Sequence, residues 1–145
     1  MTDKFYPISI KHLLKIILKE YKTKNSILGI PEELFFNPLN SQFKVKQFNQ
    51  TIDSPIGVAA GPHSQMAQNI VAAWLAGARY IELKTIQTLD ELEIAKPCID
   101  MQDEGYNCEW SQELKIKASF DEYLNAWIII HLLNHKFGWK KQIGT

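Results

Sequence analysis

Cysteine is scarce in this chain of 145 residues, and neither sign of charge is in excess. The two cysteines, Cys98 and Cys108, form no CxxC pair, so local ligands cannot build a zinc site or an iron–sulfur motif. Sixteen basic residues balance sixteen acidic ones, which gives no electrostatic reason to expect nucleic acid or an anionic membrane as a partner. The most apolar stretch, residues 126–133, is too short to span a bilayer, and no secretory signal precedes it. These absences favour a soluble, cytoplasmic protein with no metal site.

The N-terminal part of the chain is expected to hold a helix and a hairpin. Apolar residues recur with helical spacing over residues 10–21, and Ser9 can cap that helix. Residues 43–48 alternate apolar and polar side chains, which predicts a half-buried strand. Asn49 and Gln50 can turn this strand into a partner at residues 51–52.

A strand–helix–strand unit follows the hairpin. Residues 56–60 form a short apolar strand, and residues 79–84 form a second one. Between them, residues 65–76 carry a broad apolar helical stripe, with Ser64 as a candidate N-cap and Gly77 beyond the C-terminal end. A crossover of this length joins parallel strands, and its hand is right-handed by the general rule.

The remaining residues supply no second clear strand pair. Residues 89–96 are predicted to be helical, residues 97–111 to form a polar irregular loop, and a last helix to run from about Ser119 through Leu133. A parallel sheet needs both faces covered and more than two strands. The sequence therefore predicts an incomplete α/β fold, whose unpaired strand edge can associate with another chain.

Two strand ends carry the residues best suited to chemistry. The first strand ends in Ala59, Ala60 and Gly61, whose small size lets the backbone approach a flat ligand, although tight helix–strand packing favours the same residues. The second ends in Lys84 and Thr85. A lysine there can hydrogen-bond a flavin edge and offset its charge on reduction, or it can simply extend to solvent from a strand terminus. Adjacent parallel strands end at one edge, so we expect the two segments to converge.

Other polar residues give weaker signals. The amide of Asn107 donates and accepts hydrogen bonds, which suits an amide-bearing substrate, but its surroundings are also ordinary for a turn. Cys108 has no neighbouring base and is interpreted as inert. His131 and His135 lie four residues apart, as metal ligands on a helix can, but without the glutamate of an HExxH motif a structural role is favoured.

Several longer strings carry a family resemblance. They are Ser54-Pro55-Ile56-Gly57-Val58-Ala59-Ala60-Gly61-Pro62-His63, Gln68-Asn69-Ile70, Tyr80-Ile81-Glu82-Leu83-Lys84-Thr85 and Lys96-Pro97-Cys98-Ile99-Asp100. With these strings the chain resembles the dihydroorotate dehydrogenase-like, FMN-binding TIM barrels, and within them the iron–sulfur flavoproteins of the selenate reductase-like subunit family. The resemblance extends from about Pro7 to Phe137. It implies an N-terminal helical extension at residues 1–42 and the first portion of an incomplete (β/α)8 barrel at residues 43–145, with the early hairpin closing the barrel floor.

The resemblance also implies roles for individual residues. Matching by position assigns flavin contacts to Ala59, Ala60, Gly61, Lys84 and Thr85, and a substrate contact to Asn107. FMN and a small-molecule substrate are the implied ligands, whereas FAD and 4Fe–4S clusters belong to parts of the parent enzyme that this chain does not contain. The family's phosphate loops and catalytic base are not found in this sequence either. The chain alone is therefore expected to bind FMN weakly or not at all, and not to be a competent oxidoreductase.

Two alternatives stay open. One is a non-catalytic truncated or assembly fragment that binds no flavin. The other is a small flavodoxin-like or Rossmann-like binding domain, which would need several strand–helix–strand units where the sequence offers one.

Overall fold

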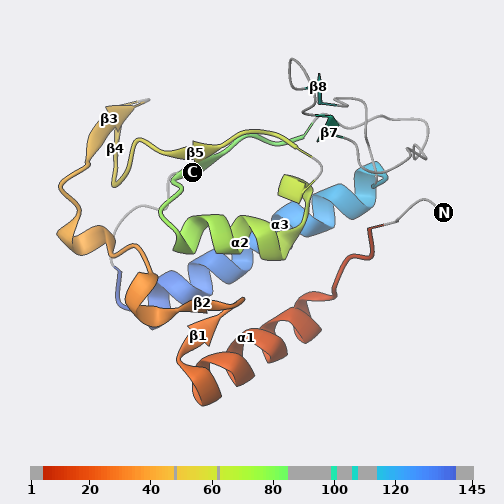
Figure 1. Cartoon of the computed structure of the whole chain (residues 1–145), viewed down its shortest axis with the longest axis horizontal. Coiled ribbons are helices and arrows are strands. Elements are labelled where there is room, and N and C mark those ends of the chain that lie inside the picture. The colour runs from red at the N-terminus through yellow and green to blue at the C-terminus, as the bar shows by residue number, and fades with distance from the viewer. Residues whose placement is uncertain are drawn as a thin grey trace.

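A computed structural model of the chain describes residues 5–47, 49–61, 63–84, 99–100, 106–107 and 114–139. Within these ranges the α-helices are α1 (Ile10–Lys24), α2 (Ala67–Leu75) and α3 (Ile116–Lys136). Short 3-10 turns occur at Glu32–Leu34, Pro38–Asn40 and His63–Gln65. Helix α2 packs along α3. Helix α1 lies below these two helices in the view of Figure 1.

The strands are short and pair two by two. In the described ranges they are β1 (Ser26–Ile27) with β2 (Ile30–Pro31), β3 (Val45–Gln47) with β4 (Gln50–Ile52), β5 (Gly57–Val58) with β6 (Tyr80–Ile81), and β7 (Ile99–Asp100) with β8 (Tyr106–Asn107). Of these four described pairs, β5 with β6 is the parallel one, in the register Gly57 to Tyr80 and Val58 to Ile81. The predicted parallel crossover is therefore confirmed, but the described residues form no closed barrel.

The hydrophobic core lies among the three helices. Its buried members are Leu13, Ile17, Ile27, Phe35, Ala67, Ile70, Val71, Trp74, Leu75, Ala126, Ile129, Ile130, Leu133 and Trp139. Trp139 packs its ring against Trp74, with centroids 5.4 Å apart, and against Phe35 at 6.5 Å. Aromatic pairs at such spacings add to the stabilisation from burial. The end of α3 is thus tied back to α2.

Helix α1 matches its prediction at the start and exceeds it at the end. The hydroxyl of Ser9 accepts a hydrogen bond from the N–H of His12 at 3.4 Å, which confirms the N-cap. The helix ends at Lys24, and the C-cap residue Asn25 has a left-handed φ of 49°. A small β1–β2 hairpin that was not predicted from the sequence follows, turning at Leu28 and Gly29.

Helix α2 begins differently from its prediction. Ser64 does not cap it, because its hydroxyl bonds the backbone of Gly61 instead. The cap residue is Met66, and the N–H of Ala67 donates to the carboxylate of Glu122 on α3 at 2.7 Å. The C-terminal end follows the prediction: Gly77 has a φ of 114°, a conformation that favours glycine.

The irregular loop predicted at residues 97–111 is wrong in part. Within residues 97–111, the structure places β7 and β8 as an antiparallel pair, where an irregular loop was expected. The helix predicted at residues 89–96 lies outside the described residues. Helix α3 starts at Ile116, three residues before Ser119, and extends beyond Leu133 to Lys136.

Candidate functional site

Strands β5 and β6 bring the two predicted segments to one edge. The N–H of Arg79 donates to the carbonyl of Ile56, and the N–H of Glu82 donates to the carbonyl of Val58, each at 2.9 Å. Because the strands are parallel, residues 59–61 and residues 82–84 both follow the same end of the pair.

The β5 end is open and small. Ala59 is exposed, and Ala60 and Gly61 are half-buried. Among the described residues, a Cβ added to Gly61 would meet nothing within 4 Å, so they leave open space beside this backbone. A flat ring can approach such a surface closely. The residues present are therefore small enough to leave this backbone face accessible to a flat ring.

The backbone N–H groups of Ala60 and Gly61 are not free to bind a ligand. The N–H of Ala60 donates to the Glu82 carboxylate at 3.0 Å, and the N–H of Gly61 donates to the hydroxyl of Ser64 at 2.8 Å. Both N–H groups are therefore engaged within the protein. A ligand at this surface would be held by stacking and by other groups rather than by these two donors.

Lys84 follows β6 and is buried, with 8% of its surface exposed. Helix α3 covers this position through Tyr123. Burial raises the pKa of the Tyr123 hydroxyl, and a contact with the backbone of Lys84 lowers it in part. Thr85, the neighbour assigned with Lys84, lies outside the described residues.

Glycine at position 57 is required by the approach of Tyr80. A Cβ added to Gly57 would lie 2.8 Å from the carbonyl oxygen of Tyr80 and even closer to the Tyr80 ring. The Tyr80 hydroxyl also donates to the carbonyl of Pro55. These contacts hold β6 tightly against β5 and so fix the edge from which both site segments emerge.

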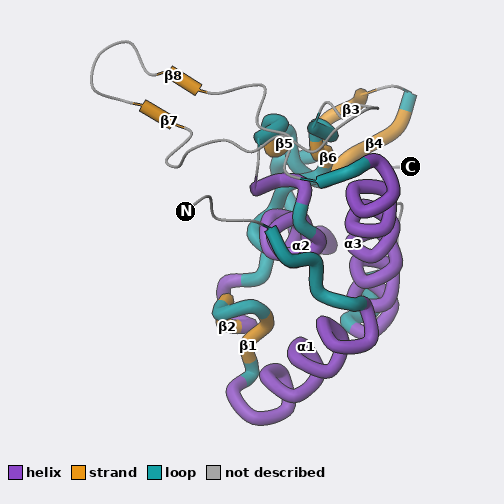
Figure 2. The backbone as a smooth tube through the Cα atoms, turned by 90° about the vertical axis from the view of Figure 1, so that its right-hand side faces the viewer, coloured by secondary structure: helices purple, strands orange, loops and turns teal. Residues whose placement is uncertain are grey.

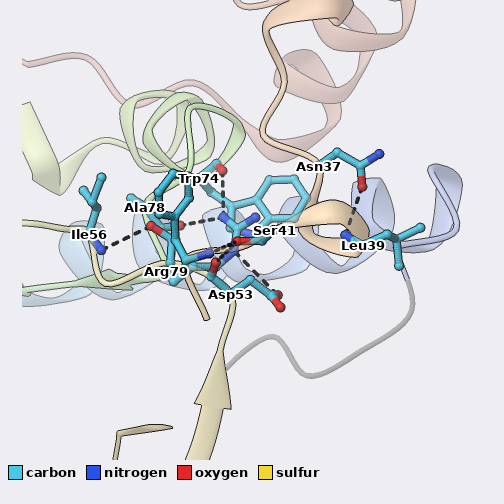
Figure 3. A network of polar contacts seen from close by, with 10 residues as sticks. Asn37, Leu39, Ser41, Asp53, Ile56, Trp74, Ala78 and Arg79 are labelled. Carbon is cyan, nitrogen blue, oxygen red and sulfur yellow. Dashed lines mark hydrogen bonds and ion pairs between the residues drawn. The ribbon is translucent and has the colours of Figure 1, made fainter. Parts of the chain in front are cut away.

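Arg79, directly before β6, anchors this strand from the other end (Figure 3). Its Nη1 donates to the carbonyls of Trp74 at 3.0 Å and Ala78 at 2.8 Å, and its Nε lies 4.0 Å from the carboxylate of Asp53. The guanidinium carbon also lies 4.6 Å from the ring centre of Phe36. Burial lowers the pKa of Arg79, and Asp53 offsets part of that effect. Sequence reasoning missed this anchor, since a single arginine after a helix gives no distinctive pattern.

An apolar cavity of about 200 Å³ lies beside β6, between α2 and α3. Its lining includes Ile70, Trp74, Leu83, Tyr123, Trp127 and Ile130. Leu83 and Trp127 at its rim are 57% and 51% exposed. Large exposed apolar side chains around a cavity mark a surface suited to a further apolar partner.

The remaining candidate residues that the structure describes lie away from the β5–β6 edge. Asn107 lies on β8 opposite Ile99, and its side chain is outside the described part of the chain. Figure 2 shows the β7–β8 hairpin standing away from β5 and β6. His131 packs beside Trp127, with ring centroids 4.2 Å apart, while His135 is exposed in the last turn of α3. Cys108 lies outside the described residues.

The described ranges contain neither a metal-binding cluster nor a membrane-spanning helix. No group of three or more histidine, cysteine, aspartate or glutamate side chains there is arranged to hold a metal ion. Among the same residues, none of the helices has the length and apolar character needed to cross a membrane.

Comparison with known proteins gives the family. Residues 28–145 match the family model described as oxidoreductase YgfK, N-terminal TIM-barrel domain. The chain is 50% identical over 137 residues to "Putative oxidoreductase YgfK" of Escherichia coli strain K12, and equally to that of strain O157:H7. Each match covers 94% of this chain and 13% of the relative, so the chain corresponds to a small share of the relatives' length. No solved structure matches. The chain belongs to the family of YgfK oxidoreductase N-terminal TIM-barrel domains.

Proposed function

We propose that this chain supplies the ring-facing part of an FMN site in an oxidoreductase of the dihydroorotate dehydrogenase-like type, close to the selenate reductase-like subunits. The observation that carries the proposal is the parallel pairing of β5 with β6. It sets an open segment of small residues and a buried lysine after the same strand ends. Membership of an oxidoreductase TIM-barrel family supports this assignment.

Each proposed residue has a distinct task. Ala59, Ala60 and Gly61 would lie against the ring face, because their side chains leave room for it. Lys84 would contact the ring edge and offset negative charge there, with Thr85 beside it. Asn107 would bind a small-molecule substrate, although β8 stands away from β5 and β6 (Figure 2), so this contact is not part of the ring-facing edge. Bound FMN would supply hydride or electron transfer, and the residues of this chain would orient the ring.

In this proposal β5 and β6 are the first parallel strands of an α/β barrel. Two parallel strands cannot close a barrel, and the relatives are several times longer than this chain. The remaining strands and the FMN phosphate site would come from polypeptide other than residues 1–145. FAD and iron–sulfur clusters would likewise belong to that part of the parent enzyme.

The chain alone is expected to bind FMN with a Kd of about 1 mM or weaker, which corresponds to roughly −4 kcal/mol. The proposed site contacts the flavin ring of FMN, but it includes no residues of this chain that would bind the FMN phosphate. The test is a titration of the isotope-labelled chain with FMN, followed by amide chemical shifts. The shifts should concentrate at residues 59–61 and at Lys84. Purification of the chain with one tightly bound flavin would contradict the expected weak affinity.

A pair of lysine variants controls the titration. Lys84→Met removes the amino group but keeps a long apolar stem, so the FMN-induced shifts should be lost. Lys15→Met removes one positive charge from an exposed position on α1 and should leave them unchanged. Equal loss in both variants would show that FMN responds only to net charge, and FMN shifts spread evenly over the surface would refute the site.

Assembly without flavin is a second candidate function, favoured by the apolar cavity beside β6. Leu83, Trp127 and Tyr80 are exposed around it. The proposed occupant is the polypeptide that follows the matched region in the YgfK relatives, because the matched family is an N-terminal domain and most of the relatives' length lies outside the match. Mixing the chain with that polypeptide should give a stable complex by gel filtration. Complex formation without flavin uptake would favour assembly, and flavin uptake by the complex would favour the FMN proposal.

A further inference from the structure

The contact between Ala60 and Glu82 departs from a regular parallel ladder. In such a ladder, a residue that donates its N–H to one carbonyl of the neighbouring strand uses its own carbonyl to accept from the residue two positions further along. Glu82 donates to the carbonyl of Val58 at 2.9 Å, so its carbonyl is the regular acceptor for Ala60. Instead, the N–H of Ala60 donates to the Glu82 side chain, 3.0 Å from Oε2.

The Glu82 carboxylate therefore accepts the hydrogen bond from Ala60 at the point where the β5–β6 pairing ends. The paired residues end at Val58 and Ile81, directly before the site segments. A glutamate side chain reaches further than a backbone carbonyl, so it can bridge strands that have begun to separate. A hydrogen bond from a backbone N–H to a carboxylate is also stronger than one to a neutral acceptor.

Ser64 completes the restraint on the same segment. Its hydroxyl accepts from the N–H of Gly61 at 2.8 Å and donates to the Gly61 carbonyl at 2.9 Å. Glu82, directly after β6, and Ser64, in the turn before α2, thus restrain the consecutive N–H groups of Ala60 and Gly61. Alanine and glycine have no side chains that could hold this backbone by packing.

We propose that Glu82 is a positioning residue, which holds the backbone of residues 59–61 in the conformation offered to the ligand. The inference rests on the proposed function for the identity of that ligand, FMN. The backbone restraint itself does not depend on a ligand. Glu82 is exposed and outside the core, so its task is the Ala60 contact rather than burial.

The first test follows the Ala60 amide in the whole chain by NMR. Hydrogen exchange at this amide is the readout, because it slows when the N–H has an acceptor. Exchange at Ala60 should accelerate about tenfold or more in Glu82→Ala, which lacks an acceptor, and should stay close to that of the unmodified protein in Glu82→Gln. Glu33→Gln, which removes the same charge from an exposed residue of the Glu32–Leu34 turn, should leave exchange at Ala60 unchanged. Unchanged exchange at Ala60 in Glu82→Ala would overturn the inference.

The second test separates this inference from the proposed function. For FMN, Glu82→Ala should weaken the affinity about tenfold, and Glu82→Gln should remain within about threefold of the unmodified chain, because its amide oxygen still accepts from Ala60. Equal affinity in all three proteins would overturn the positioning role. If the complex with the polypeptide that follows the matched region takes up no flavin while hydrogen exchange at Ala60 still depends on Glu82, the flavin assignment fails and the backbone restraint stands.

Discussion

Replacing Ile129 with alanine is expected to lower the free energy of unfolding by about 2–5 kcal/mol. Ile129 lies at the centre of α3 with none of its surface exposed, among core residues from α1 and α2. Deleting three of its side-chain carbons removes buried apolar surface and leaves a cavity that helices packed on both sides cannot easily close. The loss is large compared with the total stability of a small domain. Urea unfolding followed by circular dichroism measures it.

Two variants make this measurement specific. Leu132→Ala removes a similar apolar side chain three residues later on the same helix, but from a position that is 49% exposed. It should cost well under half as much. Ile129→Val deletes a single methylene and should cost about 0.5–1.5 kcal/mol. If Leu132→Ala matched Ile129→Ala, core burial would not explain the losses, and helix propensity could not either, since alanine is the better helix former at both positions.

The local elements were predictable because short-range chemistry decides them. Ser9 and Gly77 stand where a helix begins and ends, and each makes the cap that its residue type favours. The alternation around Val45 gives β3, and the length of the crossover between Gly57 and Tyr80 leaves only a parallel pairing. None of these predictions needs knowledge of a residue far away in sequence.

The missed features depend on contacts between distant segments. The β1–β2 hairpin forms where Glu20 of α1 accepts from the N–H groups of Leu28 and Gly29, and no alternating pattern marks such short strands. Ser64 was assigned to cap α2, yet Glu122, 55 residues further on from Ala67, takes that place. Local periodicity cannot show which distant carboxylate will arrive at a helix start.

The candidate site divides in the same way. Because parallel strands end together, the sequence alone predicts that residues 59–61 and Lys84 share an edge. It does not predict that Glu82 and Ser64 already hold the N–H groups of Ala60 and Gly61. Side-chain hydrogen bonds across a strand pair depend on small departures from regular pairing. The amino-acid composition does not predict such departures.

Glu122→Ala is expected to lower the free energy of unfolding by about 1–3 kcal/mol through the lost hydrogen bond alone. Glu122 is 1% exposed, and its carboxylate accepts from the N–H of Ala67 at the start of α2. Alanine leaves that N–H buried without this acceptor and adds a cavity. Asp121→Asn is the matched control: Asp121 pairs with Lys117 on the surface of the same helix at 2.8 Å, and an exposed pair contributes about 0.5 kcal/mol or less.

The pH dependence should distinguish the charge of Glu122 from its hydrogen bond. Burial raises the pKa of Glu122 above its ordinary value of 4.5, even though the hydrogen bonds from Ala67 and Asn125 lower it in part. A carboxyl group with a raised pKa in the folded state favours folding most when it is protonated. Its contribution is complete below the unfolded-state pKa and is lost as the pH rises through the higher folded-state value.

Glu122→Gln keeps an oxygen that can accept from Ala67 but cannot ionise. We therefore expect it to be at least as stable as the unmodified protein at neutral pH and to lose that advantage as the pH falls toward the ordinary carboxyl range. Urea midpoints measured across this range for Glu122→Gln, Glu122→Ala and the unmodified chain give the comparison. If Glu122→Gln were as unstable as Glu122→Ala at every pH, the negative charge at the start of α2 would outweigh the cost of its burial. The helix cap would then depend on the charge of Glu122 rather than on its acceptor oxygen.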